Sequence, residues 1–156
     1  MIKLTRIDDR LVHGQVAFTW TPSIGADCLV IANDKVAKDE FMKLTLGLAK
    51  PAGTKLLIKS LKDAATFLND EKNNKLKILL IINSVQDAYT LAVDVPEIRS
   101  INFGGLRSRE GSKLISKAIA ITDSDIPVIK DLLNKGIELE VRQVPTDSKQ
   151  LVESLI

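Results

Sequence analysis

Cysteine and histidine are almost absent from this sequence of 156 residues, which contains one of each, Cys28 and His13. A single thiol excludes an intrachain disulfide framework and a paired-cysteine site, and it is typical of a chain kept in a reducing compartment. A metal site built on several His and Cys ligands is excluded as well. Only an oxygen-rich site from Asp8, Asp9 and Asp34 stays open, and we expect no metal and a cytoplasmic chain.

Long hydrophobic runs and an excess of one charge are also missing. No stretch reaches the ~18 apolar residues that a membrane span needs, and charged residues break the N-terminal apolar run too early for a secretory signal. The 22 basic and 20 acidic residues leave a formal net charge of +2. Because the lysines are spread along the chain, they form no electrostatic footprint for nucleic acid, and we expect no nucleic-acid partner.

Proline and glycine are too few and too scattered to form a linker, so we expect one domain over residues 1–156. A chain of this length can bury roughly 70% of its unfolded surface in one core. Seven β-rich apolar segments are predicted to be strands, at 2–7, 28–32, 55–58, 77–82, 98–103, 117–121 and 137–141. Helical spacing separates most of them, at 16–23, 38–50, 61–69, 85–93 and 124–134.

This alternation is typical of βαβ units. The run at 78–82 is apolar without alternation, as in a parallel strand covered on both faces. Between 102 and 121 there is no clear helical run, and we expect a hairpin-like connection with one antiparallel strand there. The predicted fold is an open, mostly parallel α/β sheet of about seven strands with helices on both faces.

Ligands of open α/β sheets bind at the carboxyl ends of the strands, and His13 lies just beyond the first predicted strand. A lone histidine is often only packed or solvated, but this one is flanked by carboxylates that can fix its tautomer and by a guanidinium that can hold an anion. A helix beginning next to it would point unpaired N–H groups at the loop. The candidate residues of the loop are Asp8, Asp9, Arg10, His13, Gly14 and Gln15.

Other uses of the histidine lack the motifs that they require. The chain has no GxSxG, GxxxxGK[ST] or GxGxxG motif, although Ser84 ends a predicted strand. These absences disfavour a Ser-His-Asp hydrolase, a kinase and a dehydrogenase. The remaining chemistry is a histidine that itself takes a group, and the surrounding residue types fit phosphoryl transfer.

Two other classes of function stay open. In a receiver-like regulatory module, Asp8 and Asp9 would form an acidic Mg²⁺ pocket, although Ser60 stands where the third strand should end in an aspartate. In a non-catalytic module, the loop would bind a small anion or a partner protein without any covalent step.

Four segments carry a more specific signal. They are 6–16 (RIDDRLVHGQV), 30–40 (VIANDKVAKDE), 102–106 (NFGGL) and 136–147 (GIELEVRQVPTD). Together they resemble the IIB component of the mannose/fructose/sorbose family of the sugar phosphotransferase system, and the resemblance covers nearly the whole chain.

The resemblance implies a protein-Nπ-phosphohistidine–sugar phosphotransferase component. His13 would accept a phosphoryl group on Nδ1 from the phosphohistidine of a IIA component. It would then pass the group to a sugar entering through the membrane components IIC and IID, without a cofactor. Arg10 would face the phosphoryl group, Asp8 would lie near the imidazole, and Ser84 would lie within reach of the phosphate.

The same resemblance implies a cytoplasmic protein that associates with the membrane through its transporter partners. We interpret Arg6 either as part of a basic rim around the site or as a surface charge at the strand end. The sequence specifies neither the sugar nor the oligomeric state, and a homo-oligomer stays possible. It also leaves open whether the chain is free or part of a IIA-IIB fusion. Met1 followed at once by a strand favours a free chain.

Overall fold

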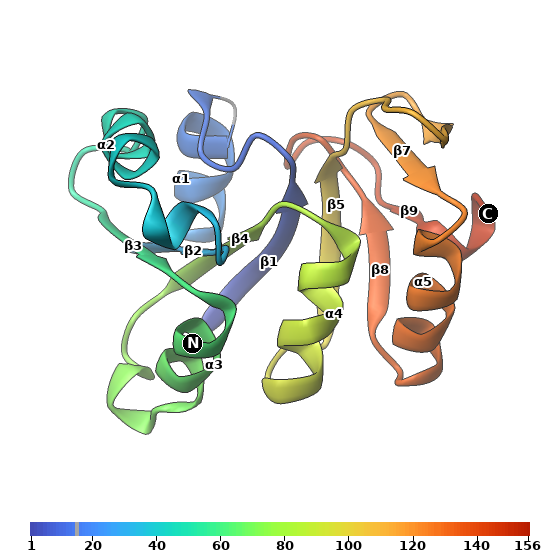
Figure 1. Ribbon diagram of the computed structural model, residues 1–156. Coiled ribbons are helices and arrows are strands. Elements are labelled where there is room, and N and C mark those ends of the chain that lie inside the picture. The colour runs from blue at the N-terminus through green and yellow to red at the C-terminus, as the bar shows by residue number, and fades with distance from the viewer. Residues whose placement is uncertain (15) are drawn as a thin grey trace.

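The computed structural model describes residues 1–14 and 16–156, and within them a seven-stranded open sheet forms the centre of the molecule (Figure 1). The strand order is β3-β2-β4-β1-β5-β8-β9. All neighbouring strands are parallel except β9, which runs antiparallel to β8. The bounds are β1 (Ile2–Asp8), β2 (Cys28–Ala32), β3 (Lys55–Lys59), β4 (Ile78–Ile82), β5 (Ser100–Gly105), β8 (Glu138–Val141) and β9 (Gln150–Leu151).

Helices cover both faces of this sheet, as the sequence predicts. A π-helical segment, Val16–Trp20, continues into α1 (Thr21–Ile24), and α2 (Glu40–Leu48) packs on the same face. The helices α3 (Leu61–Asn69), α4 (Val85–Asp94) and α5 (Asp125–Asn134) pack on the other face. Short 3₁₀ turns occupy Val36–Lys38, Glu71–Asn73 and Val152–Ser154.

Side-chain caps set the starts of α2, α3 and α4. The Ser60 hydroxyl accepts a hydrogen bond from the Asp63 amide and starts α3 at Leu61, as predicted. The predicted helix at 38–50 begins later than expected, because Asp39 adopts an extended conformation and accepts a hydrogen bond from the Met42 amide. A local cap therefore decides the boundary that hydrophobic spacing alone placed two residues too early.

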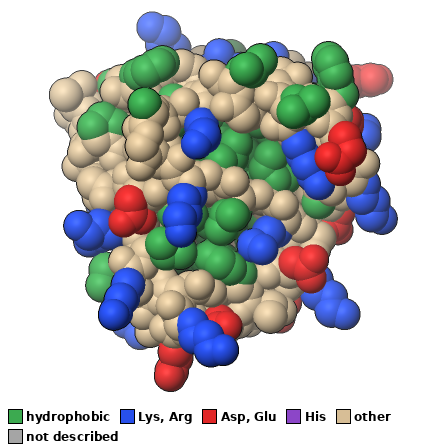
Figure 2. Space-filling view, turned by 90° about the vertical axis from the view of Figure 1, so that its left-hand side faces the viewer, with side chains coloured by type: hydrophobic (Ala, Val, Ile, Leu, Met, Phe, Trp, Pro, Cys, Tyr) green, Lys and Arg blue, Asp and Glu red, His purple; other side chains and the backbone are tan. Residues whose placement is uncertain are grey.

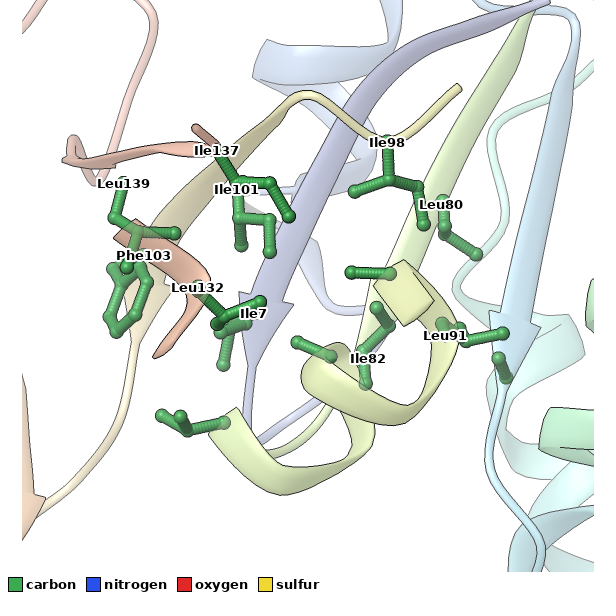
Figure 3. Packing of buried hydrophobic residues seen from close by; sticks show 14 of the residues in the cluster. Ile7, Leu80, Ile82, Leu91, Ile98, Ile101, Phe103, Leu132, Ile137 and Leu139 are labelled. Carbon is green, nitrogen blue, oxygen red and sulfur yellow. The ribbon is translucent and has the colours of Figure 1, made fainter. Parts of the chain in front are cut away.

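The central strands are buried on both faces, which explains their uninterrupted apolar sequence. In β4, Ile78, Leu80 and Ile82 contribute to the core under α3, α4 and α5, whereas Leu79 and Ile81 contribute to the core on the opposite face. Figure 3 shows Leu80 and Ile82 beside Leu91 of α4. Successive side chains along the strand thus belong to two separate hydrophobic clusters.

The segment after β5 differs in detail from the prediction. It forms a hairpin of β6 (Ser112–Ser116) and β7 (Ile119–Thr122), but this antiparallel pair is a second, two-stranded sheet. The predicted strand at 117–121 is therefore wrong as a member of the main sheet. The place of the seventh strand is taken by β9, whose two residues are both exposed and give no hydrophobic signal.

The surface carries mixed charge and some exposed apolar side chains. On the face shown in Figure 2, Lys and Arg side chains are scattered among acidic and apolar ones and do not merge into one patch. α2 buries Leu46 but leaves Phe41, Leu44 and Leu48 largely exposed. In the described part of the chain, no helix has both the length and the apolar character required to cross a membrane.

Candidate active site at the carboxyl end of β1

His13 lies in the loop between β1 and the π-helical segment, and its carbonyl oxygen accepts a hydrogen bond from the Ala17 amide at 2.9 Å. The imidazole Nε2 lies 2.8 Å from Oδ2 of Asp8, the last residue of β1. The His13 side chain is 16% exposed and the Asp8 side chain is fully buried. In the neutral imidazole this contact assigns the proton to Nε2, because a carboxylate oxygen accepts, and it leaves Nδ1 unprotonated.

Arg6 lies beneath Asp8 and binds the same carboxylate oxygen. Its Nη2 and Nε lie 3.0 and 3.3 Å from Asp8 Oδ2, because residues two apart on a strand point to the same face. Burial alone would raise the pKa of Asp8, but the hydrogen bond from His13 and the charge of Arg6 outweigh it and hold that pKa below its ordinary value. Asp8 is thus a buried carboxylate that stays ionised.

The position of Arg6 corrects both interpretations made from the sequence. Its side chain is 0% exposed, so it is neither a basic rim around the site nor a surface charge at the end of the strand. Burial lowers the pKa of the guanidinium, while the neighbouring Asp8 opposes that effect. Arg6 reaches the site only through Asp8.

Arg6 also belongs to a row of buried polar side chains across three adjacent parallel strands. The sheet register pairs Arg6 with Asn102 on β5 and Asn102 with Glu140 on β8. Arg6 Nη1 donates to Asn102 Oδ1 at 2.8 Å, and Asn102 Nδ2 donates to Glu140 Oε1 at 3.1 Å. Arg142 completes the row by donating to both Glu140 carboxylate oxygens, at 3.1 and 3.0 Å.

Trp20 lies against both arginines of this row. The centroid of its ring system is 5.5 Å from Arg6 Cζ and 5.1 Å from Arg142 Cζ, within the range of cation–π contacts. Its indole Nε1 donates to the Gln143 carbonyl oxygen at 2.9 Å. Trp20 is 2% exposed and packs in the interior.

The glycine pair at the end of β5 provides the space for Arg6 and Asp8. A Cβ atom on Gly104 would lie 1.9 Å from Arg6 Cζ, and one on Gly105 would lie 3.2 Å from Asp8 Oδ1. Any side chain at residue 104 would therefore displace the guanidinium. This close approach gives the Asn-Phe-Gly-Gly-Leu segment a physical explanation.

Asp9 and Arg10 form the outer part of the loop. The Arg10 amide donates to Asp8 Oδ1 at 3.1 Å, and Asp9 Oδ2 accepts from the amide and Nε of Arg107, at 2.8 and 3.2 Å. A pocket of about 370 Å³ opens beside them, and its lining includes the exposed cationic residues Arg10, Arg107 and Lys117. Asp9 thus anchors the loop to the segment after β5, and Arg10 presents its side chain to solvent.

The remaining predicted residues lie close to the loop or at the same edge of the sheet. Ser84 follows β4, and its hydroxyl caps α4 by accepting from the Asp87 amide at 3.1 Å. Gly14 lies beside Phe18, whose ring would be 3.9 Å from a Cβ added at Gly14. Gln15 lies outside the described residues.

The sequence alone did not identify the buried row behind the site. Asn102 and Gly104 belong to a segment that was singled out, but their contacts with Arg6 join residues about a hundred positions apart. Glu140 lies between apolar neighbours in β8, and a charged residue at an inward position of a strand is the available signal. Spacing along the chain does not show which residue it pairs with.

The chain is similar to a known protein family and to several known proteins. A family model described as the PTS system sorbose subfamily IIB component matches residues 2–156. The chain is 36% identical to a probable phosphotransferase enzyme IIB component of Streptococcus pyogenes serotype M6, with 100% of this chain and 99% of that protein covered. It is 34% identical to the mannose-specific EIIAB component of Escherichia coli K12, where it spans 48% of that longer protein.

A solved structure shows the same fold. The IIBSor domain of the sorbose permease from Klebsiella pneumoniae superposes with a TM-score of 0.94 at 30% sequence identity, covering 99% of this chain and 95% of that one. The similarity therefore extends over nearly the whole chain.

Proposed function

The chain belongs to the sorbose-subfamily IIB components of the sugar phosphotransferase system, and from this membership we propose that it is a phosphocarrier with His13 as the phosphorylated residue. His13 accepts a phosphoryl group from the phosphohistidine of a IIA component and passes it to a sugar carried by the membrane components IIC and IID. The observation that carries the proposal is the 2.8 Å contact between His13 Nε2 and the buried, ionised Asp8.

This contact supports Nδ1 as the acceptor atom. The proton stays on Nε2, so the Nδ1 lone pair attacks phosphorus as the bond between the donor nitrogen and phosphorus breaks. No proton has to leave His13 in this step. In the second step, the Nδ1–P bond breaks as the sugar hydroxyl oxygen bonds to phosphorus, and the hydroxyl proton replaces the phosphoryl group on the imidazole or passes to water.

Arg10 is proposed to hold the phosphoryl oxygens. Its backbone amide is fixed on Asp8 while its side chain is exposed, so the guanidinium can reach a group on the loop and release it again. A charge-assisted hydrogen bond of this kind contributes roughly 1.5–3 kcal/mol. A carrier benefits from such moderate binding, because a tighter hold would slow the transfer to the next partner.

The proposed partners follow from the same membership. His13 must meet two partners in turn, and a partly exposed imidazole on an edge loop suits two successive docking events. We place the protein in the cytoplasm, associated with the membrane through IIC and IID. Relatives of similar identity are named for mannose, fructose and sorbose, so the choice of sugar is assigned to the membrane components.

Two alternatives find less support. A receiver-like module needs free carboxylates for Mg²⁺, but Asp8 is bound by Arg6 and His13, and Asp9 is bound by Arg107. Residues 1–14 and 16–156 contain no group of three His, Cys, Asp or Glu side chains arranged to hold a metal ion. A non-catalytic anion-binding module would not need a histidine with a fixed tautomer.

The test is phosphorylation by a ³²P-labelled IIA donor, comparing the wild type with His13→Ala. We expect acid-labile, base-stable label in the wild type and none in the variant. Label that survives His13→Ala, or that is recovered on serine or aspartate, would contradict the proposal. Mg²⁺-dependent labelling lost in Asp9→Asn would indicate a receiver-like module, and binding of inorganic phosphate without label would indicate a binding module.

A further inference from the structure

We propose that Glu140 and Asn102 are positioning residues, which hold Arg6 so that Asp8 stays ionised and keeps the proton of His13 on Nε2. The inference rests on the proposed function, because it concerns the readiness of Nδ1 to accept a phosphoryl group. Neither Glu140 nor Asn102 belongs to the loop that carries His13. Asn102 lies on β5, the strand next to β1, and Glu140 lies on β8, the strand after that.

The Arg6 guanidinium is held from two sides. Nε and Nη2 bind Asp8, whereas Nη1 donates to Asn102 Oδ1 and, at 3.2 Å, to the Arg142 carbonyl oxygen. A planar guanidinium bound at both sides cannot rotate without losing hydrogen bonds. Asn102 therefore fixes the orientation in which Arg6 meets the carboxylate.

Glu140 fixes which end of the Asn102 amide faces Arg6. Asn102 Nδ2 donates to Glu140 Oε1, and this contact turns the amide oxygen toward Arg6. The Arg142 carbonyl oxygen accepts from the same Nδ2 at 3.2 Å. These two acceptors select the orientation together, because the NH₂ end of an amide needs an acceptor and its oxygen needs a donor. A Gln at position 140 could present its own NH₂ group and remove one of these two acceptors, which would weaken the hold on the Asn102 amide.

Charges alternate along the row, so each buried charge has a partner. Asp8 pairs with Arg6, and Glu140 pairs with Arg142, which also lies over Trp20. If Arg6 moves, Asp8 loses the positive charge that keeps it ionised in a buried position. A protonated Asp8 would then donate to Nε2, and the imidazole proton would move to Nδ1, which removes the nucleophilic lone pair.

A substitution at Gly104 would test the position of Arg6 independently of Glu140. Arg6 occupies the place of a missing side chain at residue 104, with Cζ and Nη1 1.9 and 2.1 Å from an added Cβ. Gly104→Ala would therefore displace the guanidinium without changing any charge. Gly47 on α2 has no atom within 4 Å of an added Cβ, and Gly47→Ala is its matched control.

The test uses the single imidazole of the chain, whose two ring nitrogens give one pair of signals in ¹⁵N NMR. At about pH 9, above the ordinary titration range of imidazoles, we expect the wild type to show the Nε2–H tautomer. Glu140→Gln and Gly104→Ala should shift the population toward Nδ1–H and slow phosphorylation by IIA roughly 10- to 100-fold. Glu138→Gln, on the same strand but exposed and paired with Lys149, should change neither quantity.

The two variants together keep the inference open to refutation. If both give folded spectra with the wild-type tautomer and rate, the inference is wrong, and it is also wrong if Glu138→Gln has the same effect as Glu140→Gln. If one variant fails to fold, the other decides. Failure of the wild type to accept phosphate would refute the proposed function, whereas the NMR tautomer measurement would still test the positioning.

Discussion

The Nε2 atom of His13 lies 2.8 Å from Oδ2 of Asp8, and Asp8 is entirely buried beneath the imidazole. A carboxylate in this position orients the ring and determines which nitrogen carries the proton. The distance therefore connects the end of a core strand directly to the proposed nucleophile.

The first prediction concerns that carboxylate. Asp8→Asn keeps the size of the side chain but removes the negative charge that holds the proton on Nε2, so it should weaken the preference for the reactive Nε2–H tautomer. We expect the initial rate of phosphorylation by IIA to fall roughly 10- to 100-fold. The matched control is Asp63→Asn at an exposed position on α3, and an equal loss in both variants would contradict the proposed role of Asp8.

The second prediction concerns stability at pH 7. Arg6→Met keeps the bulk of the side chain but leaves Asp8 as a buried charge without its cationic partner, which should cost about 3–5 kcal/mol of the free energy of unfolding. Lys3→Met, on the same strand at an exposed position, should change it by no more than about 0.5 kcal/mol. Urea unfolding followed by circular dichroism measures both, and similar midpoints would disprove the importance of the Arg6–Asp8 pair.

The third prediction concerns the stability of the fold at low pH. The pKa of Asp8 is lower in the folded chain than its ordinary value of 3.8, so the unfolded chain binds this proton more readily. The contribution to stability is complete above the ordinary pKa and is lost as the pH falls through the folded pKa. Asp8→Asn lacks this titration, and its free energy of unfolding should fall less than that of the wild type between about pH 5 and about pH 2. Parallel curves for the two proteins would contradict the lowered pKa.

The fourth prediction separates function from stability. Arg10 is exposed and its guanidinium is assigned to the phosphoryl group, so Arg10→Ala should slow phosphorylation roughly 10- to 100-fold, the loss of one charge-assisted hydrogen bond. Its free energy of unfolding should stay within about 0.5 kcal/mol of the wild type. An unchanged rate of labelling would remove Arg10 from the site.

Much of the architecture could be predicted because it depends on local patterns. The apolar run of β4 reveals its burial on both faces, and the Ser60 cap and helical spacing define α3. β6 and β9 were missed because neither contains a buried residue and both carry little hydrophobic periodicity. Pairing with a neighbouring strand can form strands that no local hydrophobic pattern predicts.

In the candidate site, too, local contacts could be predicted from the sequence and long-range contacts could not. The loop around His13 was identified from residues that are adjacent in the sequence, and Asp8 does lie against the imidazole. Arg6 was misplaced because its burial depends on Asn102, 96 residues away, and on the missing side chain at Gly104. Contacts of this kind arise only when parallel strands come into register.

The position of Trp20 has an optical consequence. It is the only tryptophan of the chain, and its indole is in contact with Arg6, which in turn binds the carboxylate that holds His13. Its fluorescence should therefore respond to the electrostatic environment behind His13. The arrival of a phosphoryl group on His13 should change that emission, so each round of loading and unloading could be followed in real time with the unlabelled protein.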